Sequence, residues 1–263
     1  MEVFGICNQS FAPVRKQPGD TSEMVNQLIY GDLLYIKAKV NSWLLIETVH
    51  DAYEGWVDIK QVKQLTKDQF RQLADSPKAL VSSVAAVAAL VDYMTGTMHL
   101  SLGSTLYQFR NNTFNNMEGE ATFSGELLTL NSNPDGQKIA LDANRYLNAP
   151  YLWGGRSVWG IDCSGLVQMS YLLNGIALPR DAADQSQKGE IVHFIHEIKA
   201  GDLAFFDNEE GKIVHVGLIM PNKSIIHASG KVRIDSIDHQ GIYQPQTQQY
   251  SHKLRLIKRI IPS

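Results

Sequence analysis

The stretch GIDCSGLV, residues 160–167, holds one of only two cysteines in a chain of 263 residues. Small and apolar residues recur at positions 163, 166, 167, 170 and 171, the spacing of one helix face, and Asn174-Gly175 predicts the helix end. Asp162 is then expected to cap the helix, with Cys163 in its first turn. Unpaired N–H groups there favour an anion, so we expect the thiol to be shifted toward thiolate beside a potential oxyanion hole.

The sequence around this helix indicates the fold class of the second half of the chain. Upstream, QKIALDANRYL (residues 137–147) has helical spacing of its apolar residues. Downstream, GDLAFFD (201–207), KIVHVGLIM (212–220) and SIIHAS (224–229) are typical of short strands. A helix followed by a small antiparallel sheet predicts an α+β domain over residues 134–263.

The first half of the chain indicates short strands instead. Residues 1–66 contain LIYGDLLYIKAKV, SWLLIETV and YEGWVDI, clusters of β-branched and aromatic residues separated by turns, which predict a small barrel. Residues 67–77 have helical spacing and end at Pro77, so we interpret them as a connector. Residues 78–133 predict a second small barrel, and NSNPDG (131–136) predicts the linker that follows it.

Two of the eight histidines, His215 and His227, lie inside apolar predicted strands that the turn PNKS joins. Either histidine alone could be a buried core residue whose ring nitrogens are hydrogen-bonded. On adjacent strands, however, His227 could orient the imidazole of His215, as the third polar residue of a catalytic triad orients the general base. His193 and His196 form an H-x-x-H in a segment, EIVHFIHEI, that is expected to be extended; without further ligands we expect no metal site there. The remaining histidines have polar or turn-like surroundings and are expected to be exposed: His50, His99, His239 and His252.

Composition excludes several classes of protein. Charged residues make up 19% of the chain and its formal net charge is −3, so no broad attraction to nucleic acid or anionic membrane is expected. The longest apolar run, residues 79–91, contains two serines and is too short to insert into a membrane. The N-terminus lacks the pattern of a secretory signal, so we expect a cytoplasmic protein, or a periplasmic or secreted one if a signal has been removed. Cys7 has no base nearby in sequence and is expected to be structural.

Six motifs that follow one another in the second half carry a resemblance: PYLWGG (150–155), DCSG (162–165), LPRDAADQ (178–185), KAGDLAFF (199–206), HVGLI (215–219) and IIHAS (225–229). Together they resemble the NlpC family of papain-like cell-wall cysteine peptidases. The resemblance implies a catalytic triad of Cys163, His215 and His227. It also implies that no metal or organic cofactor is required.

The first half resembles the bacterial SH3-like domains that precede the peptidase in one branch of this family. The matching segments are APVRKQPGDTSEMVNQLIYGD (12–32) and DAYEGWVDI (51–59). The resemblance implies two SH3-like barrels before an α+β papain-like domain. It also implies hydrolysis of the γ-D-glutamyl-diamino acid bond of murein peptides with a free N-terminal L-alanine, releasing L-Ala-D-Glu during peptide recycling. The diamino acid, meso-diaminopimelate or L-lysine, stays open.

The resemblance also implies a set of substrate contacts. Asp162, together with Glu23 and Tyr53 of the first barrel, would bind the L-alanyl ammonium. Tyr151 would bind substrate or assist the oxyanion. Without the resemblance, Glu23 would be interpreted as an exposed acid, and the two tyrosines as strand or core residues.

Two further substrate contacts follow from the same motifs. Ser164 matches a family position, although a hydroxyl there also suits hydrogen bonding at a helix start. Asp181 matches as well, but Ala182 stands after it, where relatives can carry a hydroxyl. Two other functions stay open: an amidase or acyltransferase that acts on another acyl group, and a non-catalytic protein that binds wall peptides.

Overall fold

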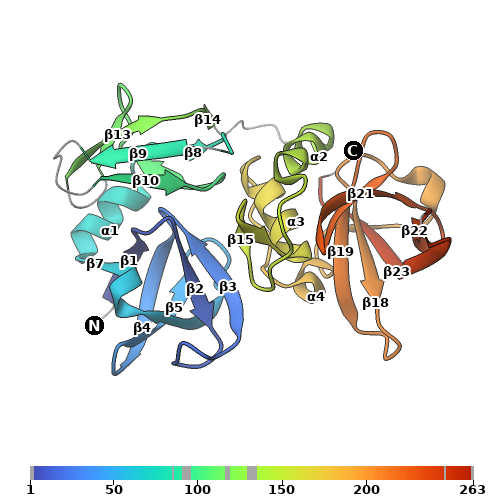
Figure 1. Ribbon diagram of the computed structural model, residues 1–263, viewed down its shortest axis with the longest axis horizontal. Helices are drawn as coiled ribbons and strands as arrows, with labels where there is room; N and C mark the ends of the chain where they lie inside the picture. Colours follow the sequence, from blue (N-terminus) through green and yellow to red (C-terminus); the bar gives the residue numbers. More distant parts are fainter. Residues whose placement is uncertain are drawn as a thin grey trace. The chain divides into compact units, whose positions relative to one another are not determined.

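The computed structural model describes residues 3–84, 86–90, 96–115, 119–128, 135–245 and 247–261. The chain divides into two compact units (Figure 1). Unit 1 is Met1–Leu130 together with Trp153–Val158, and unit 2 is Asn131–Leu152 together with Trp159–Ser263. A short segment that precedes Cys163 in sequence therefore belongs to unit 1.

The first part of unit 1 is a curled antiparallel sheet. Its strands lie in the order β3-β2-β6-β5-β4-β1-β7. The alternation of apolar and polar residues along the chain decides which side chains face inward, because successive strand residues point to opposite faces. Cys7, which the sequence predicts to be structural, is fully buried in the resulting core. The bounds are β1 Val3–Cys7, β2 Phe11–Arg15, β3 Met24–Ile29, β4 Leu33–Val40, β5 Trp43–Thr48, β6 Glu54–Asp58 and β7 Val62–Leu65, with the 3-10 helix η1 Ile59–Gln61 before β7.

Helix α1, Lys67–Ala74, lies in the segment 67–77 for which the sequence predicts helical spacing, and the role of this segment as a connector stays a prediction. It begins with a capping box, in which Thr66 accepts from the backbone N–H of Gln69 and the Gln69 side chain accepts from the backbone N–H of Thr66. Its apolar face buries Phe70 and Leu73 against β1 and β7. The polar residues of the helix face solvent, so the amphipathic spacing of the sequence matches the way the helix packs.

The rest of unit 1 consists of short strands in two sheets, with the orders β10-β9-β13-β12 and β11-β8-β14. Their shared core includes Leu100, Leu106 and Phe114. The second SH3-like barrel stays a prediction, and residues 131–134 of the predicted linker lie outside the described residues. The bounds are β8 Lys78–Val81, β9 Ala86–Leu90, β10 Thr97–Leu100, β11 Thr105–Tyr107, β12 Thr113–Asn115, β13 Glu120–Ser124 and β14 Leu127–Leu128. Strand β15, Arg156–Ser157, belongs to the second segment of this unit.

Unit 2 begins with helices and continues as a sheet. The predicted helix over 137–147 is observed as α2, Gly136–Ala143, followed by the 3-10 turn η2, Asn144–Tyr146. Strand β16, Gly160–Ile161, leads into α3, Cys163–Leu172, and α4 covers Ala182–Gln185. The later elements are β17 Glu190–Val192, η3 Ile195–Glu197, β18 Leu203–Asp207, β19 Ile213–Ile219, β20 Ile225–Ser229, β21 Lys231–Ile237, β22 Gly241–Gln244 and β23 Gln249–Arg259.

The sheet of unit 2 runs β17-β23-β18-β19-β20-β21-β22, and β23 also pairs with β22, so the sheet closes on itself. Helix α3 packs against β19 and β20 (Figure 1). Residues Cys163–Tyr171 are all buried, so α3 is covered on more than the single face predicted. Burial on all sides is tolerated because its polar side chains find main-chain acceptors: Ser170 Oγ donates to the Leu166 carbonyl at 2.7 Å and Gln168 to the Leu178 carbonyl at 3.0 Å.

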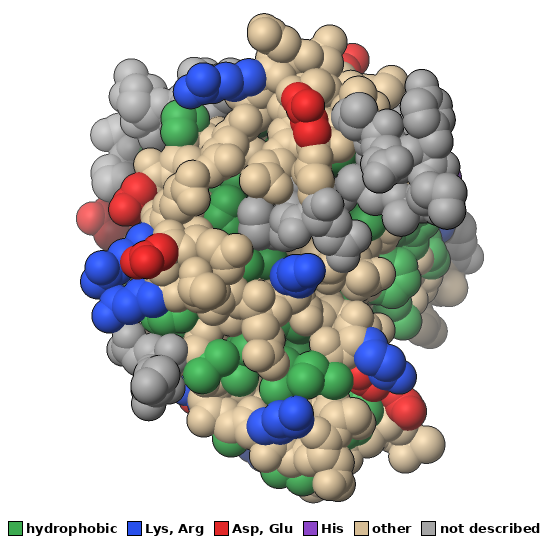
Figure 2. All heavy atoms as spheres, turned by 90° about the vertical axis from the view of Figure 1, so that its left-hand side faces the viewer, with side chains coloured by type: hydrophobic (Ala, Val, Ile, Leu, Met, Phe, Trp, Pro, Cys, Tyr) green, Lys and Arg blue, Asp and Glu red, His purple; other side chains and the backbone are tan. Residues whose placement is uncertain are grey.

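The segment EIVHFIHEI is expected from its sequence to be extended, but only its start is a strand, β17. The 3-10 helix η3 follows that strand. His193 and His196 are both exposed. Within the part of the chain that the structure describes, no helix is long and apolar enough to cross a membrane. Figure 2 shows one face of the molecule, over which basic and acidic side chains are both scattered.

Candidate active site

Cys163 is the first residue of α3, and the cap predicted for this helix is present. Asp162 Oδ1 accepts the Gly165 backbone N–H at 2.7 Å, as an N-cap residue does. The Cys163 residue is only 6% exposed. Its sulfur lies within hydrogen-bonding reach of the backbone N–H groups of Val216 and Ser164. The nucleophile candidate therefore lies against β19, next to the residue that follows His215.

Burial, and second to it the nearby Asp162 carboxylate, raise the pKa of the Cys163 thiol to about 12. The N–H groups of Val216 and Ser164 and the charge of Arg180 act in the opposite direction but do not outweigh burial. The expectation of a thiolate in the resting site is therefore wrong. A helix N-terminus favours the anion only by a modest amount, whereas loss of water around the sulfur costs more.

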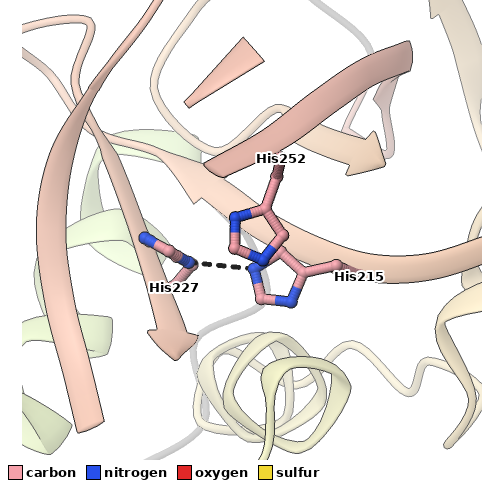
Figure 3. Close-up of side chains that lie close together, drawn as sticks. All are labelled: His215, His227 and His252. Carbon is pink, nitrogen blue, oxygen red and sulfur yellow. Dashed lines mark hydrogen bonds between the residues drawn. The ribbon is translucent and has the colours of Figure 1, made fainter. Parts of the chain in front are cut away.

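The two strand histidines meet, as their placement on adjacent strands predicted. His215 Nε2 and His227 Nδ1 are 2.9 Å apart, and both residues are buried (Figure 3). Strands β19 and β20 pair with Leu218 opposite Ile226, a register that sets Gly217 opposite His227. A Cβ at Gly217 would lie 3.0 Å from the Cβ of His227. The missing side chain at Gly217 therefore leaves the His227 ring free to reach diagonally toward His215.

A carboxylate completes the relay behind the histidines. His227 Nε2 lies 2.9 Å from Asp235 Oδ2, and Arg233 Nη2 donates to the other oxygen of Asp235 at 2.8 Å. The pKa of Asp235 is lowered: burial opposes the charged form, but the hydrogen bonds of His227 and Arg233 outweigh it. Since an ionised carboxylate only accepts, His227 donates from Nε2 and keeps a lone pair on Nδ1.

This carboxylate decides which tautomer His215 adopts. The lone pair on His227 Nδ1 accepts a hydrogen bond, so the proton between the rings belongs to His215 Nε2. His215 then carries its own lone pair on Nδ1, the nitrogen that a general base needs. Burial, together with the two neighbouring imidazoles of His252 and His227, lowers the pKa of His215 well below its usual value of 6.5. The resting site therefore combines a neutral thiol with a neutral imidazole.

Tyr151 is held close to the helix start by backbone hydrogen bonds. Its N–H donates to the Gly230 carbonyl at 3.1 Å, and the Ile161 N–H donates to the Pro150 carbonyl at 3.0 Å. Burial, and second to it the nearby groups Cys163 and Asp162, raise the pKa of the Tyr151 phenol to about 12. The phenol is therefore a protonated donor near the sulfur. That is a suitable position for stabilising an oxyanion.

Arg180 is the residue of this region that the sequence reasoning missed, although it lies in the quoted motif LPRDAADQ. Its guanidinium forms a buried bidentate ion pair with Asp162, in which Nη2 lies 2.6 Å from Oδ2 and Nη1 lies 3.0 Å from Oδ1. Nη1 also donates to Ser164 Oγ at 2.8 Å. The Ser164 hydroxyl lies 3.3 Å from Asp162 Oδ1. Asp162 and Ser164 thus hold the start of α3 together with Arg180, and their assigned roles toward substrate stay predictions.

Each of the remaining predicted residues is described by its own local contacts. Glu23, in unit 1, forms an exposed pair with Lys16 at 3.3 Å and accepts from Trp153 Nε1 at 3.0 Å. Tyr53, also in unit 1, donates from its hydroxyl to the Val25 carbonyl at 3.4 Å. Asp181 is exposed at the start of α4. Their contacts with a substrate stay predictions.

His252 contradicts its sequence-based interpretation as an exposed residue. It is half-buried on β23, and its ring stacks on that of His215 with the centroids 4.1 Å apart and the planes at 24°. His50 is half-buried as well, whereas His99 and His239 are exposed as predicted. The sequence held a signal for this burial, because alternate strand residues face one side and His252 lies two positions before Leu254, which packs against the core.

Comparisons with known proteins agree with this geometry. Residues 148–251 match the NlpC/P60 family, and residues 14–62 match the bacterial dipeptidyl-peptidase SH3 domain. The chain is similar to a gamma-D-glutamyl-L-lysine dipeptidyl-peptidase of Bacillus subtilis (strain 168), 47% identical over 85 residues, which are 32% of this chain and 28% of that relative. It is also similar to dipeptidyl-peptidase 6 of Lysinibacillus sphaericus, 28% identical over 260 residues, which cover 85% of this chain and 88% of the other.

A solved structure shares the fold. The crystal structure of an NlpC/P60 family protein from Bacillus cereus ATCC 10987 aligns with a TM-score of 0.84 and 19% sequence identity, covering 98% of this chain and 100% of that one. The SH3-like first domain and the peptidase fold that the sequence predicts are thereby confirmed.

Proposed function

This chain carries an NlpC/P60 cysteine peptidase domain behind a bacterial dipeptidyl-peptidase SH3 domain, and on that basis we propose that it hydrolyses the γ-D-glutamyl-diamino acid bond of murein peptides. The observation that carries the proposal is the relay from Asp235 through His227 to His215, whose lone pair on Nδ1 is available on the strand that packs against Cys163. Relatives named as gamma-D-glutamyl-L-lysine dipeptidyl-peptidase support the choice of bond.

In the proposed reaction, the Cys163 sulfur attacks the γ-carbonyl of D-glutamate while its proton moves to His215 Nδ1. Proton transfer accompanies attack because the resting pair is neutral. The new S–C bond gives a tetrahedral oxyanion, which Tyr151 and the N–H groups at the start of α3 stabilise. His215 then protonates the leaving amine of the diamino acid, and the C–N bond breaks to leave a thioester.

Water completes the cycle. His215 Nδ1, neutral again after protonating the amine, takes a proton from water as the oxygen attacks the thioester carbonyl. Collapse of the second tetrahedral species breaks the S–C bond, and the proton returns from His215 to the sulfur. The products are L-Ala-D-Glu and a peptide or amino acid with a new free amine. Each step uses residues of the chain and water alone.

We further propose selectivity for peptides with a free N-terminal L-alanine. Glu23 supplies the negative charge for the alanyl ammonium and Tyr53 a polar contact, as the family resemblance implies. Because Arg180 already neutralises Asp162 through two close contacts, the part that Asp162 plays toward the ammonium is secondary to its role at the helix start. The proposal also includes two points about the fold: the peptidase domain is of the α+β class, and a second SH3-like barrel precedes it. It further includes a cytoplasmic role in recycling released peptides.

A substrate pair tests the specificity. Purified protein is incubated with L-Ala-γ-D-Glu-L-Lys, its meso-diaminopimelate analogue, and the N-acetyl form of each, and products are identified by mass spectrometry. The proposal expects L-Ala-D-Glu from the free peptides and none from the acetylated ones. Glu23→Gln should raise KM for the free peptides, whereas the matched change Glu54→Gln should not. Equal turnover of acetylated peptides would favour the amidase or acyltransferase, and no turnover with Cys163 intact would favour a binding protein.

A further inference from the structure

Three imidazoles from three strands converge at one point in unit 2. His215 comes from β19, His227 from β20 and His252 from β23, and one ligand nitrogen of each lies within 4.8 Å of the other two. In Figure 3 the His252 ring overlaps the end of the His215 ring that forms the hydrogen bond to His227, and the two rings are stacked. The peptidase mechanism uses His215 and His227 but gives no role to His252. A third imidazole at this point therefore needs its own explanation.

Two of the nitrogens that face away from this point, those of His227 and His252, are held by oxygen partners. His227 Nε2 is 2.9 Å from the Asp235 carboxylate, and Arg233 fixes that carboxylate in turn. His252 Nδ1 is 2.9 Å from Ser251 Oγ. A metal-binding histidine characteristically donates its second N–H to a carboxylate or another oxygen, which orients the ring and leaves the other nitrogen for the metal. His227 and His252 both have this arrangement.

We propose that His215, His227 and His252 form a binding site for a divalent transition metal of the zinc type, and that an ion bound there holds the peptidase inactive. Three neutral imidazoles with a fourth position for water are a common zinc ligand set. Imidazole nitrogen selects zinc, copper, nickel and cobalt over magnesium and calcium, which require oxygen ligands. Binding of the metal is independent of the proposed peptidase function, whereas its inhibitory effect rests on that function.

The rings must move a short distance to close around the ion. Tetrahedral zinc with bonds near 2.0–2.1 Å separates its nitrogen ligands by roughly 3.3 Å. The His215 to His227 pair, at 2.9 Å, opens slightly, and the wider pairs close. His252 makes most of the movement, because it is only half-buried while the other two are buried. Its stacking on His215 is given up in the process.

Metal binding removes the general base without touching the sulfur. In the metal-free relay, the proton of His215 is on Nε2 and the lone pair is on Nδ1. A metal at Nε2 displaces that proton, and a neutral His215 must then carry its proton on Nδ1. The nitrogen that should accept the Cys163 proton becomes a donor. Metal ligation and base catalysis are thus mutually exclusive.

Binding is tested on the untagged full chain with Cys163→Ala, because a thiol could itself bind zinc. Equilibrium dialysis against Zn²⁺ should give one ion per chain, and dialysis against Mg²⁺ none. Adding His252→Phe, which keeps a stacked ring, should abolish zinc binding, whereas the exposed control His239→Phe should not. Asp235→Asn should weaken binding about 10- to 100-fold through loss of the outer hydrogen bond.

A spectroscopic measurement covers the case in which the double variant is unstable. Nitrogen-15 NMR of the histidine rings in the Cys163→Ala chain should show zinc shifting Nε2 of His215, Nδ1 of His227 and one nitrogen of His252, with His239 unmoved. Zinc that shifts no ring of this cluster, or that binds equally after His252→Phe, overturns the site.

Inhibition is measured separately on the wild-type chain. Hydrolysis of L-Ala-γ-D-Glu-L-Lys should fall as one zinc ion binds and recover fully on adding a chelator, with the dissociation constant from dialysis matching the inhibition constant. Zinc bound without loss of hydrolysis overturns the inhibitory part. If the wild-type chain hydrolyses no murein peptide at all, the proposed function fails, while the dialysis and NMR results still decide the metal site.

Discussion

Replacing Asp235 by Asn tests the relay that fixes the tautomer of His215. The Asp235 carboxylate accepts from His227 Nε2 at 2.9 Å, and its other oxygen accepts from Arg233 Nη2 at 2.8 Å. Arg233 Nε also lies 2.7 Å from the oxygen that faces His227, but the hydrogen bond of Arg233 is the one from Nη2 to the other oxygen. In the Asn variant, the single oxygen keeps that hydrogen bond, so the amide NH₂ faces His227. His227 then accepts at Nε2 and carries its proton on Nδ1. That proton is donated to His215 Nε2, and His215 Nδ1 is left protonated.

The size of the effect follows from the hydrogen bonds that change before catalysis. Restoring the active tautomer re-makes the bond between His215 and His227 in the reverse direction, but it leaves His227 Nε2–H facing the amide NH₂ without an acceptor. A buried donor without a partner costs about 1–3 kcal/mol, which corresponds to a loss of roughly 5- to 160-fold in kcat/KM.

The assay is steady-state hydrolysis of L-Ala-γ-D-Glu-L-Lys by wild type and variant, with circular dichroism to show that both fold. Asp207→Asn is the matched control, because Asp207 pairs with the exposed Arg255 at 3.6 Å on the same sheet and has no part in the relay. A value of kcat/KM for Asp235→Asn equal to that of the control would refute the tautomer argument.

Three further outcomes are expected. Arg180→Met leaves the buried carboxylate of Asp162 without its cation and should lower the free energy of unfolding by about 3–5 kcal/mol in urea titrations; a loss no larger than for exposed Arg255→Met would contradict this. Alkylation of Cys163 by iodoacetamide should be slow at pH 7 and still rise above pH 10, because the pKa of the thiol is about 12; a plateau with its midpoint near 8.5 would show an ordinary thiol. The base works only as neutral His215, whose pKa lies well below 6.5, so kcat/KM should persist as the pH falls through 6.5 and decline only well below it; an acid limb at 6.5 or above would contradict the lowered pKa.

The nucleophile and the paired histidines could be predicted because each depends on local pattern. Asp162 before an apolar helix face places Cys163 in the first turn of the helix. The apolar pattern around each histidine indicates two adjacent strands, and their side chains can then come into contact. The strands that carry His215 and His227 were predicted for the same reason. Their contact depends on Gly217, whose importance appears only once the register is known.

Asp235 and Arg180 could not be found in this way, because their partners are set by tertiary structure. Asp235 faces His227 only through the hairpin turn at Gly230, which pairs His227 with Arg233. Arg180 reaches Asp162 from a loop 18 residues later in the chain. The raised pKa of the Cys163 thiol escaped prediction for a related reason, since sequence indicates the helix start but not the depth of burial that outweighs it.

The most direct test of the central claim is to trap the thioester on Cys163. Wild-type protein is mixed with L-Ala-γ-D-Glu-L-Lys, quenched in acid within milliseconds to seconds, and analysed by intact-mass spectrometry and peptide mapping. We predict a transient adduct with the mass of the L-Ala-γ-D-Glu acyl group on the peptide that contains Cys163, and neither adduct nor product with Cys163→Ala. Release of L-Ala-D-Glu by the Cys163→Ala protein would contradict the account.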